Sequence, residues 1–265
     1  MKYVLSLSFG KDSMALLIEV IKRKLPLDYV IFCDIRFNDE ISGEHPIMAQ
    51  WIPEAEKILK DKFGVDVIHL KGKWTFESLF FKTKEATKRT NPKHIGQIYG
   101  FPYLIGAWCN SRLKLEPIKK FERELIKEGE KITWYVGIAS DEPKRLERYK
   151  QLETDKIKYI TLADLKISEI DAFEICKQHN LLSPKYSNSF RGGCWFCNKQ
   201  SLADLWNLWH DYPEYYKKLE DMEKQSPNTF KIERSLKDIR KQFEQGYMPK
   251  KKKRHKQYSI FDFIE

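Results

Sequence analysis

The chain has 265 residues, of which 42% are hydrophobic and 32% charged, a composition typical of a globular protein rather than a disordered one. Its net charge of +10 suits a polyanionic partner. No run of about 18 apolar residues occurs and no basic region precedes an apolar core at the start, so we expect a cytoplasmic protein without membrane contact.

Strand and helix patterns alternate over the first two thirds of the chain. The expected strands, rich in β-branched and aromatic residues, cover 3–7, 29–33, 65–70, 132–138 and 157–162. Helical patterns cover 14–21, 44–63 and 113–128. Strands separated by helices predict an α/β fold, with a five-stranded parallel sheet and helices on both faces. Ligands of such sheets bind at the carboxyl ends of the strands.

The pattern changes beyond about residue 165, where it becomes helical and contains cysteines. We therefore expect a first domain over 1–165, a smaller helical lobe with a Cys-x-x-Cys sequence over 166–248, and a basic tail over 249–265. Residues 71–100 are irregular, basic and aromatic, and we expect this insertion to face a substrate.

The sequence Ser-Phe-Gly-Lys-Asp-Ser at 8–13 lies between the first expected strand and the first expected helix. Amide groups at a helix start have no intrahelical partner, and the helix dipole favours an anion there. Gly10 permits close approach of a ligand, Ser8 and Ser13 add hydroxyl donors, and Lys11 adds a mobile positive charge. The spacing is not that of a Walker A loop.

This loop resembles the S-G-G-x-D-S PP-loop of the ATP pyrophosphatases in the adenine-nucleotide α-hydrolase superfamily. Phe9 replaces the first glycine, as in the variant loop of the phosphoadenosine-phosphosulfate reductase family. The resemblance implies that residues 8–13 bind the pyrophosphate part of ATP, that Mg²⁺ bridges the phosphates, and that Asp12 orients the loop or approaches the metal. The alternative is an ordinary tight strand-to-helix turn.

A second segment, after the fourth expected strand, is similar to the G-x-R-x-x-E-S-x-R segment of sulfonucleotide reductases. Gly137, Glu142 and Arg145 match that pattern. The resemblance implies that Gly137 borders the nucleotide and that Arg145, with Lys11, offsets charge on the phosphates. A solvated charged turn is the alternative. The family also places an aspartate near the adenosine, and Asp34 ends the second expected strand.

Cysteines supply the third resemblance. The segment at Cys109 is similar to C-T-x-x-L-K-x-x-P of the DNA-phosphorothioation sulfur-transfer proteins, and Cys194 and Cys197 form the Cys-x-x-Cys pair. A middle cysteine and a later pair hold a [4Fe–4S] cluster in the family, and Cys176 is available as a fourth thiolate. Zinc also accepts four thiolates, so [4Fe–4S], zinc and free thiols stay open. Cys33, inside an apolar strand, is expected in the core.

Sulfonucleotide reductases need a nucleophilic cysteine near the C-terminus, yet no cysteine follows Cys197. The resemblance therefore implies an ATP-dependent enzyme that cleaves between the α- and β-phosphates and adenylylates an acceptor in sulfur transfer or nucleic-acid modification. One alternative is a sulfonucleotide reductase with altered thiol chemistry. The other is a non-catalytic, nucleotide-switched accessory protein that binds nucleic acid.

The C-terminal tail contains two signals. Residues 250–256 are basic throughout and are typical of a poorly packed segment that contacts nucleic acid. Gln257–Phe261 resembles the Q-L-[S/D]-L-F pentapeptide that binds the bacterial replication sliding clamp. A terminal segment docked on its own domain is the alternative.

Overall fold

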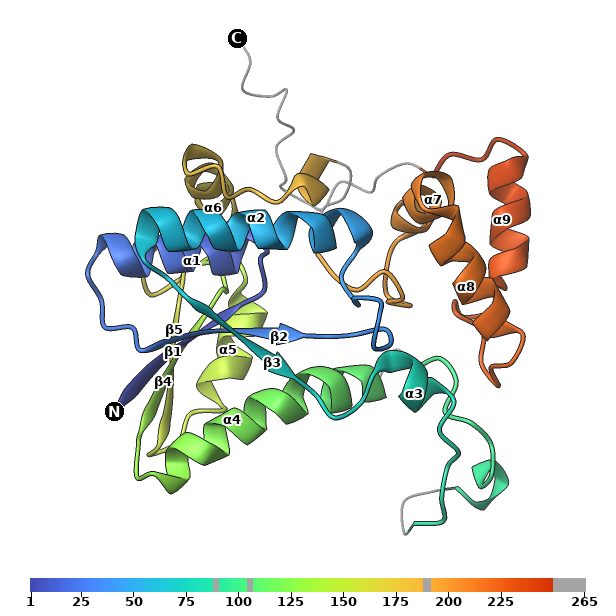
Figure 1. Cartoon of the computed structure of the whole chain (residues 1–265), viewed down its shortest axis with the longest axis horizontal. Coiled ribbons are helices and arrows are strands. Elements are labelled where there is room, and N and C mark those ends of the chain that lie inside the picture. The colour runs from blue at the N-terminus through green and yellow to red at the C-terminus, as the bar shows by residue number, and fades with distance from the viewer. Residues whose placement is uncertain (88–90, 104–106, 188–191, 250–265) are drawn as a thin grey trace.

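A five-stranded parallel sheet forms the centre of the protein, with the strand order β3-β2-β1-β4-β5 (Figure 1). The computed structural model describes residues 1–87, 91–103, 107–187 and 192–249. The strands are β1 Lys2–Leu7, β2 Tyr29–Asp34, β3 Val67–Lys71, β4 Ile132–Val136 and β5 Ile157–Thr161. Every neighbouring pair of strands is parallel, so the predicted α/β class with its five-stranded sheet is confirmed.

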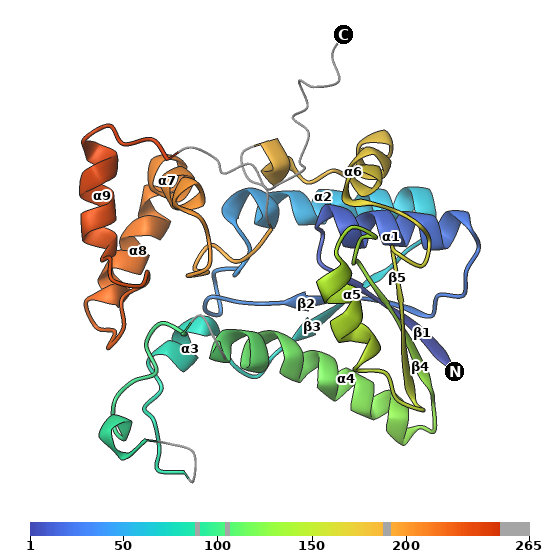
Figure 2. The same cartoon turned by 180° about the vertical axis from the view of Figure 1, so that it is seen from behind.

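Helices cover both faces of this sheet (Figures 1 and 2). One face carries α1 Lys11–Lys22, α2 Pro46–Phe63 and α6 Glu169–Gln178; the other carries α4 Glu116–Lys127 and α5 Pro143–Lys150. A short helix, α3 Phe76–Phe80, follows β3, and a π-helix, Asn110–Leu115, leads into α4. The remaining helices, α7 Leu202–Asp211, α8 Pro213–Glu223 and α9 Leu236–Glu244, stand together at one end. Among the described residues, no helix is long and apolar enough to cross a membrane.

Local sequence signals explain where the helices that frame the site begin and end. Helix α1 begins at Lys11, directly after Gly10, so half of the predicted phosphate loop is the first turn of the helix. Helix α2 has Pro46 at its first position, where the missing N–H costs nothing, and ends at Gly64 with a left-handed φ of 66°. The loops that precede these two helices are therefore fixed by the helix starts.

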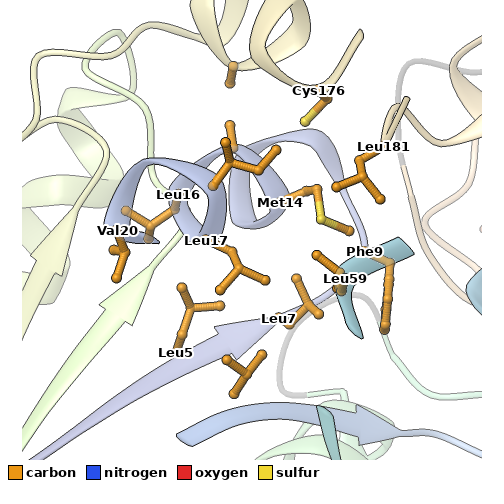
Figure 3. Packing of buried hydrophobic residues seen from close by; sticks show 14 of the residues in the cluster. Leu5, Leu7, Phe9, Met14, Leu16, Leu17, Val20, Leu59, Cys176 and Leu181 are labelled. Carbon is orange, nitrogen blue, oxygen red and sulfur yellow. The ribbon is translucent and has the colours of Figure 1, made fainter. Parts of the chain in front are cut away.

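The first hydrophobic core lies between the sheet and helices α1, α2 and α6 (Figure 3). Helix α1 is buried almost all round, with Met14 and Leu17 fully inaccessible. Helix α6 packs on α1 through Ala172 and Cys176. The predicted domain limit at 165 assigns α6 to the C-terminal lobe, whereas the structure packs this helix into the first core. The apolar face of α6 packs against α1, which lies far away in the sequence, so this contact could not be predicted from neighbouring residues.

A second core is built mainly from aromatic side chains and joins the loop after β2 to α3 and to helices α7 to α9. The ring centroids of Phe76 and Phe196 lie 4.0 Å apart, and those of Phe37 and Trp195 lie 4.6 Å apart. Trp195 and Phe196 are the two residues between the cysteines of the Cys-x-x-Cys pair. The cysteine turn is therefore anchored in the centre of the lobe rather than attached to its surface.

The tail that carries the basic run at 250–256 and the segment Gln257–Phe261 lies outside the described residues. Its predicted contacts with nucleic acid and with a sliding clamp stay predictions.

Phe9 adopts a left-handed backbone conformation, with a φ of 53°, although it is not glycine. Its side chain is fully buried, and its ring meets the rings of Phe32 and Trp51 edge-on, at centroid distances of 5.0 and 6.3 Å. A Cβ in this conformation costs about 1–2 kcal/mol, which ring packing must offset. Glycine, the residue of the PP-loop motif at this position, adopts the conformation freely.

This conformation predicts an unusual order of stability for two variants. Phe9→Ala should lower the free energy of unfolding by about 3–5 kcal/mol through loss of the buried ring. Phe9→Gly should be about 1 kcal/mol more stable than Phe9→Ala, because only glycine escapes the left-handed penalty. Urea unfolding measures both.

Phe32 in strand β2 is the matched control, because it is buried next to Phe9 in extended backbone. There the order should reverse, with Phe32→Gly roughly 0.5–1 kcal/mol less stable than Phe32→Ala. A Phe9→Gly variant less stable than Phe9→Ala would show that the left-handed conformation is not enforced.

Candidate functional site

The phosphate-type loop is held in shape by its own serine hydroxyls. Ser13 Oγ accepts a hydrogen bond from Ser8 N at 3.0 Å and donates one to Gly10 O at 3.1 Å. Ser8 Oγ also lies 3.0 Å from Ser13 Oγ, within hydrogen-bonding distance. The Ser13 side chain, predicted as a donor to phosphate, is buried and serves to close the turn between β1 and α1.

The amide groups of the first turn of α1 give the loop its capacity for an anion. The N–H groups of Asp12 and Ser13 have no acceptor among the described residues, whereas Lys11 N donates to Tyr186 Oη at 3.0 Å. Gly137 lies against this turn, and a Cβ at that position would come within 2.5 Å of Ser13 N. The loop after β4 thus approaches the helix start as closely as backbone allows, which requires glycine at 137.

Lys11 is not the mobile cation that the sequence predicts. Its residue is only 6% exposed, and its ammonium nitrogen lies 2.6 Å from Asp12 Oδ1 and 3.4 Å from Glu169 Oε2. Burial raises the pKa of Asp12, and the Lys11 charge opposes that shift. A polyphosphate at this loop would meet two carboxylates beside one ammonium group, and a divalent cation would offset that repulsion.

Arg145 lies on the same edge of the sheet, in the loop and helix that follow β4. Its guanidinium nitrogen Nη1 lies 2.7 Å from each carboxylate oxygen of Glu142, and Glu142 also accepts from Ala139 N at 3.3 Å. Burial opposes the charged form of Arg145, but its hydrogen bonds to Glu142 raise the pKa of the guanidinium. Asp34 ends β2, the strand next to β1, and its carboxylate lies 3.8 Å from the Lys71 ammonium group.

Three of the predicted cysteine ligands are neighbours. Cys197 N donates to Cys194 O at 3.1 Å and closes the Cys-x-x-Cys turn. Burial raises the pKa of Cys109 to about 11, and the nearby Cys197 thiol adds to the shift. Burial likewise raises the pKa of Cys194, with further contributions from Glu44, Cys197 and Cys109.

Cys176 is not brought to these three thiols. It is fully buried under the phosphate-type loop, and its Sγ donates to Lys11 O at 3.2 Å (Figure 3). Burial raises its pKa to about 12. The fourth-ligand role predicted for Cys176 does not match this position, because helix α6 packs on α1 rather than on the lobe. Cys33 is buried, as predicted, with its thiol 3.5 Å from Leu113 O.

The described side chains do not by themselves form a metal site. No group of three or more His, Cys, Asp or Glu side chains in the described ranges has the arrangement that holds a metal ion. Cys109, Cys194 and Cys197 have the donor chemistry for iron–sulfur or zinc and lie near one another, but they are not assembled around a common point.

A small, partly open cavity adjoins the cysteine turn. It is lined by Lys185, Gly192, Gly193, Cys194, Cys197, Gln200 and Asp204. The Lys185 ammonium group donates to Gly193 O at 3.5 Å, and burial lowers its pKa. Sequence reasoning missed this lysine, since no motif links a residue nine positions earlier to Cys194.

Two neighbouring residues at the start of α2 also belong to this region. Glu44 pairs with Cys194 in an isolated antiparallel bridge, and burial raises the pKa of its carboxyl. His45 is buried with no partner for Nδ1 among the described residues, and burial lowers its pKa to about 4. At the sequence level Glu44 carries only the signal of an acidic residue favoured near a helix start.

Comparisons with known proteins give distant relatives. No protein-family model matches the chain. It is 36% identical over 108 residues to the uncharacterized nin region protein ORF290 of Escherichia phage lambda, covering 40% of this chain and 34% of that protein. It is 24% identical over 231 residues to the uncharacterized protein MJ0066 of Methanocaldococcus jannaschii, covering 83% of this chain and 41% of that protein. The chain thus spans well under half the length of either relative.

Among solved structures, the chain is similar to the U34-tRNA thiolase NcsA from Methanococcus maripaludis, solved with its [4Fe–4S] cluster. The identity is 16% and the TM-score 0.38, over 84% of this chain and 71% of the thiolase chain. A likeness at this level assigns no activity.

The buried thiol under the loop predicts a pH dependence of stability. The pKa of Cys176 is raised to about 12 in the folded chain, so its stabilising contribution is complete below the unfolded thiol pKa of about 8.5. Above that pH the unfolded state ionises first, and stability falls by up to about 1.4 kcal/mol per pH unit from this group.

Urea unfolding between pH 8 and pH 10.5 tests this. Cys176→Ala should give a shallower loss of unfolding free energy with pH than the natural chain. Val20→Ala, which shortens a fully buried side chain of α1, the helix on which α6 and Cys176 pack, should lower stability without changing the slope. Equal slopes in all three proteins would contradict the assignment.

Proposed function

We propose that the chain is a PP-loop enzyme that binds ATP, cleaves it between the α- and β-phosphates, and adenylylates an acceptor in sulfur transfer or nucleic-acid modification. The proposal is supported most by the proximity of separate sequence motifs in the fold. The loop at 8–13, Gly137 and Arg145 match motifs far apart in sequence. Gly137 packs against the first turn of α1, Arg145 interacts electrostatically with Asp12, and no described residue accepts from the amides of Asp12 and Ser13.

Each of these groups has a separate role in the proposed reaction. The free first-turn amides and the α1 dipole hold the β- and γ-phosphates that leave as pyrophosphate. An acceptor atom attacks the α-phosphorus as the bond to the bridging oxygen breaks. Arg145 and Lys11 offset the charge that develops on that oxygen, and Mg²⁺ would neutralise the phosphates beside Asp12.

We assign sulfur handling to Cys109, Cys194 and Cys197. If the predicted [4Fe–4S] cluster or zinc ion is bound, these three thiolates are its ligands and Cys176 is not. The cavity described above is lined by Cys194 and Cys197 and so adjoins two of these thiols.

The insertion after β3 favours a nucleic-acid acceptor. The insertion at 71–100, which begins at the last residue of β3, contains seven lysines or arginines against two glutamates, half of the net charge of +10. The ammonium groups of Lys73 and Lys82 lie 5.1 and 5.0 Å from the centre of the Trp74 ring. Cations that alternate with aromatic rings suit phosphates and stacked bases.

This insertion also contacts the residue before Cys109. The Tyr99 ring meets the Trp108 ring edge-on at 6.3 Å, and Trp108 directly precedes Cys109. An acceptor bound along the insertion would therefore extend toward the proposed sulfur-handling residues. The rival function, a non-catalytic nucleic-acid-binding protein switched by nucleotide, shares the charged surface but predicts no ATP cleavage.

Release of pyrophosphate tests the proposal. The anaerobically purified protein, incubated with MgATP and candidate nucleic-acid acceptors, should release pyrophosphate and form an adenylylated acceptor, and AMP should appear when a sulfur nucleophile then displaces it. Gly137→Ala should lower the rate at least tenfold, because the new Cβ would meet the backbone at Ser13. Lys11→Ala should lower it similarly by removing the buried cation.

Lys22→Ala, at the exposed end of the same helix, is the matched control and should leave the rate unchanged. ATP binding without product formation, with every acceptor tried, would favour the accessory-protein function instead.

The insertion predicts salt-dependent binding of single-stranded oligonucleotides. Lys73→Ala and Lys82→Ala should each weaken binding. Each should also reduce the magnitude of the slope of log affinity against log salt by about 1, the value expected for one lost phosphate contact. Fluorescence anisotropy from 50 to 300 mM salt measures this. Lys120→Ala on α4 should change neither quantity, and a similar effect there would mean diffuse rather than local attraction.

A further inference from the structure

The Tyr186 hydroxyl lies at the start of α1, where helix amides are available to an anion. It accepts the hydrogen bond of Lys11 N at 3.0 Å, the first amide of α1, and lies 3.4 Å from where a Cβ on Gly10 would stand. Tyr186 belongs to the short 3₁₀ turn Pro184–Ser187, far along the chain from Lys11. Its ring is half-buried and packs near Phe173 of α6.

One N–H group can serve only one strong acceptor. A phosphate that binds the start of α1 takes its first-turn amides, and Lys11 N is the first of them. The phenol oxygen must leave before phosphate can accept this hydrogen bond. The contact therefore competes with nucleotide binding rather than assisting it.

The residue before Tyr186 connects the same turn to the cysteines. Lys185 lines the cavity beside Cys194 and Cys197, and its ammonium group donates to Gly193 O. A shift of the turn that withdraws Tyr186 from Lys11 moves Lys185 as well, because the two are consecutive. The loop and the cysteine cavity are thus linked by two adjacent side chains.

We propose that Tyr186 is a displaceable plug of the phosphate loop, and that its displacement by the polyphosphate of ATP shifts Lys185 and opens the cavity beside Cys194. This inference rests on the proposed function and adds to it an order of events. Nucleotide occupancy precedes access to the cysteine turn.

Tyr186→Phe is the sharpest test, since it removes the competing oxygen and keeps the ring. Calorimetry with MgATP should give a dissociation constant about fivefold lower than that of the natural chain, the size expected for one lost hydrogen bond. Tyr247→Phe, an exposed tyrosine in the lobe, should bind as the natural chain does. Thermal unfolding verifies that both variants are folded.

Hydrogen exchange supplies the second readout. In the natural chain MgATP should speed amide exchange at 184–187 and 192–197, whereas Tyr186→Phe should show the faster exchange without nucleotide. Weaker ATP binding by Tyr186→Phe would make the hydroxyl a ligand and overturn the plug, as would equal affinities. If neither protein binds ATP, the proposed function itself fails.

Discussion

The polar groups of one residue, Lys11, tie the site together. Its amide donates to Tyr186, its carbonyl accepts from the Cys176 thiol, and its ammonium group pairs with Asp12 and Glu169. These partners come from α1, α6 and the turn after α6, so a single residue joins three segments around the helix start. Because α1 is buried almost all round, none of these contacts can relax by moving the helix.

Each of the two cores holds a different part of the candidate site in place. The first core fixes the start of α1 and the loop after β4, and with them the first-turn amides of α1 and Gly137. The second core fixes the cysteine turn through Trp195 and Phe196, and it includes the residues after β2 and β3 that begin the basic insertion. The segment around Tyr186 runs between the two, which makes it the natural place for one to influence the other.

Much of the fold follows from local sequence, as do the residues of the phosphate-type loop. Strand runs, the Gly64 helix end and the small-residue loop before α1 are short-range signals. The positions of Cys176 and Tyr186 were not predictable, because each depends on how α6 packs against α1 from more than 160 residues away. The left-handed conformation of Phe9 is equally hidden, since the sequence shows only an apolar residue where glycine is usual.

The two residues between the cysteines, Trp195 and Phe196, connect the thiols along the chain and also pack in the second core. Trp195 is fully buried against Phe37, so the spacing and direction of the two thiols are set by the same packing that holds the lobe together. Mutational drift at the cysteine turn is thereby constrained by stability even where sulfur chemistry is not under selection. Residues 82–87 and 91–97 of the insertion lie outside that core and are mostly exposed, so packing constrains them less. Under the proposed function, descendants of this chain could exchange one acceptor for another there while the phosphate-type loop and the cysteine turn stay unchanged.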